Sequence, residues 1–281
     1  MMLVLFCGGF AWVQHFETQG NALLRAGGGS SRLEMAGGNM EGKELRFGVG
    51  ATALTAVVTS NTATGSSNAM NDSFSSLGGM MVLVNMLLGE LVFGGLGTGL
   101  YSIVMVTVVA VFLAGLMVGR TPEYLGKKIG PAENKMIMLY ALAAPLVILP
   151  LTAVALCSNA GLSAETTNAG AHRFTAILFA YTSCFANNGQ AFMSLNGNTL
   201  FYNVTTAVAM VAGRYALAVP ALGVAGLFAK QKKAPVSSGT LATDSVSFGV
   251  LLTACIVVLT GLSYLAALAL GPVLERLVGG A

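Results

Sequence analysis

Charged residues are scarce in this chain. Only 9% of its 281 residues are Asp, Glu, Lys or Arg, against about 25% in typical soluble domains. Apolar residues make up 55%, and the mean hydropathy is +0.76. This composition excludes a soluble globular domain and indicates an all-α integral membrane protein, because a helix satisfies its own backbone polar groups in lipid.

Residues that carry metal or redox chemistry are also few. The four cysteines lie far apart and form no Cys-x-x-Cys pair, so neither a zinc site nor a disulfide framework is indicated. The two histidines, His15 and His172, have no carboxylate at helical spacing, and we expect both at the membrane interface rather than as ligands or bases. A net charge of +3 without a basic stripe argues against a nucleic-acid partner.

Apolar stretches of membrane length alternate with short polar or basic connections. We expect spans at Met136–Leu156, Phe201–Ala229 and Val246–Leu270, and an apolar run twice the length of one span covers Met80–Gly119. Met1–Phe16 is too short to cross and lacks the basic start of a signal peptide. We therefore expect it to be the second half of a membrane helix whose start is missing.

The basic residues indicate which ends of the spans face the cytoplasm. Lys and Arg gather in Arg120–Lys135, and again at Lys230, Lys232 and Lys233. By the positive-inside rule both connections are cytoplasmic. Cys157–His172 is then external, and the C-terminus lies outside as well.

A polar segment around a lone glycine occurs twice. The first, Thr59–Asn68, follows the apolar stretch Phe47–Val58, and the second, Thr182–Gln190, ends the stretch Arg173–Ser183. Both stretches are too short to cross and have the length of a pore helix that enters partway. Irregular backbone at membrane depth is tolerated only where it lines a cavity or is buried in protein. We therefore expect two re-entrant loops of an ion pore.

The same order of span, external loop, half-length helix, glycine segment, returning span and basic loop occurs twice. Residues 136–233 form the second unit, and residues 234–281 a C-terminal transmembrane helix. Residues 1–135 form the first unit, which comprises an external loop (17–46), a pore helix (47–58), a filter segment (59–68), a glycine-broken helix (80–119) and a cytoplasmic loop (120–135).

The residues of the two loops are those that a dehydrated cation requires. Backbone carbonyls replace water without a net charge that would trap the ion, and glycine allows successive carbonyls to face one way. The expected filter residues are Thr62, Ala63, Thr64, Gly65, Ser66, Ala186, Asn187, Asn188, Gly189 and Gln190. The cation is expected to be held by the carbonyls of Thr64, Gly65, Asn188 and Gly189, while the side chains of Thr62, Thr64, Asn187 and Asn188 add oxygens or brace the loops.

Arg214 lies far from either end of its apolar stretch, where a charge costs at least about 2.5–3.5 kcal/mol. We expect it to face a cavity, or to pair with an acid such as Glu90. Glu90 lies one turn before a glycine-rich interruption of its own helix, which is a candidate gate. The glycines of that interruption are Gly94, Gly95, Gly97 and Gly99.

Four longer motifs resemble the potassium-transporting ATPase A chain, KdpA. They are Asn39–Gly48, Ala69–Phe74, Gly94–Tyr101 and Gly119–Lys128. The resemblance covers nearly the whole chain and implies the third and fourth repeats of a four-repeat pore, with the N-terminal half of the protein absent. It also implies that Arg214 lies beneath the filter and resists free ion leakage.

The resemblance implies a potassium-binding and potassium-translocating subunit of a bacterial ATP-driven, high-affinity uptake complex in the inner membrane. The transported ion is K+, which would be handed to the P-type ATPase of the complex, its B subunit, with the small C and F subunits as further partners besides membrane lipid. No phosphorylation motif or Walker loop occurs, so ATP hydrolysis belongs to a partner. The alternatives are a passive Trk/Ktr/HKT-type channel or symporter, which shares the repeat topology, and a non-transporting membrane scaffold.

Overall fold

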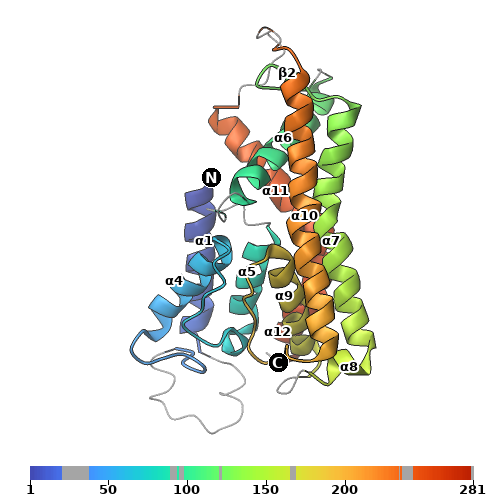
Figure 1. Cartoon of the computed structure of the whole chain (residues 1–281). Coiled ribbons are helices and arrows are strands. Elements are labelled where there is room, and N and C mark those ends of the chain that lie inside the picture. Colours follow the sequence, from blue (N-terminus) through green and yellow to red (C-terminus); the bar gives the residue numbers. More distant parts are fainter. Residues whose placement is uncertain are drawn as a thin grey trace.

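In a computed structural model of the protein (Figure 1), helices dominate, which confirms the expected all-α membrane fold. The only paired strands in the described part of the chain are β1 (Glu123–Tyr124) and β2 (Lys127–Lys128), a two-strand antiparallel hairpin. The structure describes residues 1–20, 38–88, 94, 98–119, 122–164, 169–233, 235 and 243–279.

Long apolar helices form the frame. They are α6 (Thr98–Val118), α7 (Pro131–Cys157), α10 (Leu200–Lys230) and α11 (Val246–Leu268). α11 continues through a π-helical turn, η2 (Ala269–Val273), into α12 (Leu274–Gly279). Among the described residues, four helical stretches are long and apolar enough to cross a membrane. The expected spans agree with these helices to within a few residues, and α7 and α10 run side by side (Figure 1).

Two helices of about half that length lie inside this frame. α4 (Gly48–Asn61) packs against α1 (Met2–Thr18), and α9 (Ala171–Ala186) is enclosed by α5 (Ser76–Leu87), α7 and α10. From Thr175 to Ser183 every residue of α9 is buried, as in a helix surrounded by protein on all sides. α4 continues through Asn61, so its last three residues are helical where the sequence suggested a loop.

The apolar run of the first unit is divided into α5 and α6, with the glycine-rich interruption between them. A Cβ on Gly99 would lie 2.6 Å from the Cα of Gly94, so the backbone at these two glycines packs closely. Glu90, Gly95 and Gly97 lie outside the described residues. Two further short helices in the described part of the chain are η1 (Asn71–Ser73), which follows the first loop, and α8 (Asn159–Leu162), which follows α7.

The two basic connections contact one another at one end of the long helices (Figure 1). Lys127 donates to the backbone oxygens of Phe228 and, at 3.1 Å, Gln231, and the side-chain amide of Gln231 donates to the oxygen of Lys128 at 3.0 Å. Both connections therefore lie on the same side of the protein, as the positive-inside rule requires.

A buried carboxylate ties the end of α1 to the loops around it. Glu17 accepts hydrogen bonds from Asn39 Nδ2 (2.9 Å), Ser75 N (2.7 Å) and Ser75 Oγ (2.6 Å). It also pairs with Lys43 Nζ at 2.8 Å, and both side chains are fully buried. Lys43 in turn lies 4.5 Å from the centre of the Phe74 ring. The segment before α4 is thus fastened to the segment that follows the first loop.

Glu17→Gln should destabilise the protein by about 3–5 kcal/mol, because it leaves the Lys43 ammonium buried without a counter-charge. Glu44→Gln is the matched control, since Glu44 pairs with Arg46 at 2.7 Å but both side chains are largely exposed. The control should cost at most about 1 kcal/mol. Thermal unfolding in detergent compares the two, and equal stability would contradict a structural role for the buried pair.

Candidate functional site: two re-entrant loops above a cavity

The loops that follow α4 and α9 meet at their backbones. A Cβ on Gly65 would overlap the carbonyl oxygen of Asn188 and lie 3.4 Å from the nitrogen of Gln190. Gly65 also has φ +70°, a left-handed conformation that glycine adopts without strain. Both features favour glycine over any other residue at this position, and the contact brings the two expected filter segments together.

The two loops share a backbone pattern that their sequences do not. Positive φ occurs at Ala63 (56°) and Gly65 (70°) in the first loop, and at Asn187 (60°) and Gly189 (71°) in the second. In each loop the residue between the pair has negative φ, so left-handed and ordinary conformations alternate. A Cβ on Gly189 would meet nothing within 4 Å, so that glycine is required for its conformation alone.

Several of the expected filter side chains hold the loops rather than face open space. Asn188 Oδ1 accepts from Ser183 Oγ at 2.5 Å and from the nitrogen of Gln190 at 2.9 Å. Asn187 Nδ2 donates to the oxygen of Phe185, and Thr62 Oγ1 to that of Val58. The exposed members of the expected filter set are Thr64, Ser66 and Gly189, while Ala63, Gly65 and Ala186 are half-buried.

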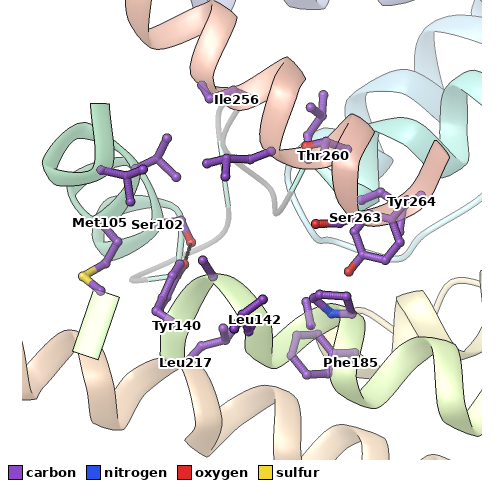
Figure 2. A pocket seen from close by; sticks show the side chains of 18 of the residues that line it. Ser102, Met105, Tyr140, Leu142, Phe185, Leu217, Ile256, Thr260, Ser263 and Tyr264 are labelled. Carbon is purple, nitrogen blue, oxygen red and sulfur yellow. Dashed lines mark hydrogen bonds between the residues drawn. The ribbon is translucent and has the colours of Figure 1, made fainter. Parts of the chain in front are cut away.

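A cavity of about 670 Å³ begins at the end of α9. Thr182, Phe185, Ala186 and Asn187 line it there, and the rest of its wall is mostly apolar. Figure 2 shows Phe185, Ser263 and Tyr264 at one end of the view and, at the other, a hydrogen bond between Ser102 and Tyr140 (2.7 Å). The cavity thus lies between α6, α7, α10 and α11, next to the second loop.

Arg214 lies in the middle of α10 and lines this cavity, with its side chain exposed in this chain. Its position is fixed by the neighbouring Gly213, where a Cβ would overlap the carbonyl oxygen of Phe185. The backbone of α10 therefore touches the end of α9, and Arg214 is the next residue along α10. The expected pairing of Arg214 with Glu90 is not tested, because Glu90 lies outside the described residues.

His172, at the start of α9, has two carboxylate partners that its neighbours in the sequence do not indicate. Its Nε2 lies 2.6 Å from Asp72 Oδ1 and its Nδ1 lies 3.0 Å from Glu275 Oε1. Asp72 belongs to η1 after the first loop, and Glu275 to α12. These partners are 100 and 103 positions away, so a search at helical spacing cannot find them.

The charge on this histidine is stabilised by its surroundings. Burial by itself disfavours the imidazolium, but the hydrogen bonds and charges of Asp72 and Glu275 outweigh burial and raise the pKa of His172 from 6.5 to about 10. His172 is therefore protonated at neutral pH. It joins the second half-helix to the segment after the first loop and to the C-terminal helix.

These features define a class: a polytopic helical membrane protein in which half-length helices present paired re-entrant loops above a cavity. A sequence profile of the family "Potassium-transporting ATPase A subunit" (KdpA) matches residues 1–277. The chain belongs to this family, which confirms the resemblance of its motifs.

Relatives named "Potassium-transporting ATPase potassium-binding subunit" extend over the whole chain. One from Methylobacterium nodulans is 51% identical over 280 residues, which are 100% of this chain and 48% of the relative. One from Methylorubrum extorquens is 52% identical over 100% of this chain and 48% of the relative. One from Mesorhizobium japonicum is 50% identical over 98% of this chain and 47% of the relative. The chain thus spans about half the length of the curated relatives it matches.

Four positions that hold the loops were not among the expected site residues: Ser183, Gly213, His172 and Thr59, whose Oγ1 lies 3.3 Å from Nε2 of Gln190. The sequence does indicate a role for Gly213, because a glycine inside a membrane span is typical of close backbone packing. Gly213 also directly precedes Arg214, which the sequence had already singled out. Thr59 and Ser183 had a weaker signal, because each lies in the last turn of a half-length helix. His172 had none.

The His172 contacts predict a pH-dependent stability. Because the pKa is higher in the folded than in the unfolded protein, the stabilisation is complete below pH 6.5 and is lost as pH rises through about 10. Between pH 7 and pH 10.5 the free energy of unfolding of the wild-type protein should fall by on the order of a few kcal/mol. A His172→Gln variant should be less stable at pH 7 and should not show this further loss. Thermal unfolding at several pH values measures this, and parallel curves would contradict it.

Proposed function

We propose that this chain forms the third and fourth quarters of a potassium filter in the potassium-binding subunit of an ATP-driven uptake system. The relatives of the chain carry that subunit name. The transported ion is K+, bound by the carbonyls of Thr64, Gly65, Asn188 and Gly189.

One observation carries this proposal: the Gly65 backbone packs against the Asn188 carbonyl, between loops that share one alternating pattern of φ. A backbone that alternates between left-handed and ordinary conformations turns successive carbonyl oxygens toward the same side. A row of such oxygens replaces the hydration shell of a cation. Two matched rows in contact are what a filter shared between repeats requires.

The half-length helices add a favourable field for a cation. Each ends at its loop, α4 at Asn61 and α9 at Ala186. The C-terminal end of a helix carries a partial negative charge of about half an electron. Both ends therefore favour K+ at the loops, whereas an anion would be repelled.

Arg214 and the cavity supply the second element of the proposal. An ion that leaves the loops enters the cavity. There the positive charge of Arg214 raises the electrostatic energy of any cation, which opposes free leakage. The close packing of Gly94 against Gly99 supports a gate at the glycine-rich interruption, to which we also assign Gly95, Gly97 and Glu90.

The remaining assignments follow from family membership. We propose that the protein works with the P-type ATPase of the complex, its B subunit, and with the small C and F subunits in a bacterial inner membrane, with the C-terminus external. Its domains are the pore repeats 1–135 and 136–233 and the C-terminal segment 234–281. The contact of the two basic connections on one side supports this orientation.

The two loop glycines should differ in tolerance, tested in the full-length protein within its complex. Gly65→Ala adds both strain and overlap and should weaken the apparent potassium affinity by about tenfold or more. Gly189→Ala adds strain alone and should have a smaller effect, while Gly226→Ala, in open space on α10, should have none.

Uptake of K+ and Rb+ at graded concentrations measures these affinities, and thermal unfolding with and without K+ checks that each variant folds. If Gly65→Ala leaves both affinity and selectivity at wild-type values in a folded complex, the filter assignment is wrong.

Arg214→Gln should allow potassium to leak through the complex without ATP, whereas Arg214→Lys, which keeps the charge, should leak less. Potassium efflux from loaded proteoliposomes measures the leak, and uptake with and without ATP distinguishes a pump from a passive channel. A tight, fully coupled Arg214→Gln complex would show that the arginine does not oppose leakage.

A further inference from the structure

A buried side chain joins the second loop to the end of α4, the helix that precedes the first loop. Gln190 is 2% exposed, and its Nε2 lies 3.3 Å from Oγ1 of Thr59, which is 5% exposed. Gln190 belongs to the second loop and Thr59 to the last turn of α4, 131 positions apart. The neighbouring Gly189 is exposed, so the chain turns from open space to the protein interior between these two residues.

The partner hydroxyl is oriented for this bond. Thr59 Oγ1 donates to the backbone carbonyl oxygen of Thr55 at 2.8 Å. The lone pairs of Thr59 Oγ1 are therefore left for a donor from Gln190. No other hydrogen bond of the Gln190 side chain is found among the described residues, and its Oε1 is buried without a partner there. The bond to Thr59 is therefore the one directional contact of this side chain in the described part of the chain.

Gln190 is also fixed to its own loop. Its backbone nitrogen donates to Asn188 Oδ1 at 2.9 Å, and Asn188 is the residue whose carbonyl packs against Gly65. A displacement of Gln190 would therefore also shift Asn188, whose carbonyl packs against Gly65 of the first loop. Ser183 bonds the same Oδ1 from α9, so Asn188 links Gln190 to the end of that helix.

Two opposed restraints then act on the distance between the loops. The backbone contact of Gly65 with Asn188 limits how closely the loops approach, because any nearer position would overlap. The bond between Gln190 and Thr59 limits how far they separate. Both limits are needed, since a filter that can widen will admit cations of other sizes.

We propose that Gln190 is a positioning residue for ion selectivity, which acts through Thr59 to hold the two loops at a fixed spacing without touching the ion. This inference rests on the proposed filter function. It assigns the discrimination between similar cations partly to a side chain behind the filter, on the face away from the ion.

The test uses the full-length protein in its complex and the ratio of the apparent KM values for Rb+ and K+. Gln190→Leu and Thr59→Val should each lower the preference for K+ by roughly fivefold, the worth of one hydrogen bond, with turnover largely kept. The double variant should be no worse than either single one, because both remove the same bond. Thr59→Ser keeps the hydroxyl and should restore the preference.

Thr55→Val is the matched control. Thr55 lies on the same helix and its hydroxyl bonds only the oxygen of Ala51 among the described residues, so the variant should keep the wild-type ratio. Gln190→Met, closer in shape to glutamine, replaces Gln190→Leu if that complex does not assemble.

The outcomes separate this inference from the filter proposal. If Gly65→Ala loses selectivity while the Gln190 and Thr59 variants behave like Thr55→Val, or if their effects simply add, Gln190 does not position the loops. If Gly65→Ala itself keeps wild-type affinity and selectivity, the filter proposal fails and the inference with it.

Discussion

The arrangement of the loops depends on one close approach, that of the Gly65 backbone to the carbonyl of Asn188. Two chain segments can come this near only if a side chain is missing and if the helices behind them do not move. α9 meets the second condition because it is buried on all sides, and α10 touches its end at Gly213. The loops are thus located by helix packing, while their own residues supply the conformations and the side-chain bonds that the contact requires.

Irregular backbone inside a membrane protein needs partners, and here they come from a few polar side chains. Ser183, Asn188 and Thr62 bond the loops from within, while Glu17 and His172 hold the outer segments through buried charge pairs. Because an unpaired polar group in such surroundings costs about 1–3 kcal/mol or more, these bonds decide which loop conformation is stable. They explain why so polar a set of residues occurs in so apolar a chain.

The sequence predicts the frame well and the contacts poorly. Spans follow from hydropathy, and the half-length helices from apolar stretches that are too short to cross, because bilayer thickness sets both lengths. The position of Arg214 at a cavity follows from the cost of an isolated charge. In contrast, nothing local indicates positive φ at Ala63, or the pairing of His172 with Asp72 100 positions away, since these arise only when distant segments pack together.

The two loops correspond in topology but are not equivalent in their physics. Gly65 is required because another backbone lies against it, whereas Gly189 has open space around it and is required only for its φ. Asn187 occupies the position in the second loop that Ala63 occupies in the first, and asparagine tolerates the left-handed region. Repeated architecture therefore keeps the backbone path and allows each loop its own means of holding it. For this reason the role of a residue in one repeat does not transfer to the residue at the matching position in the other.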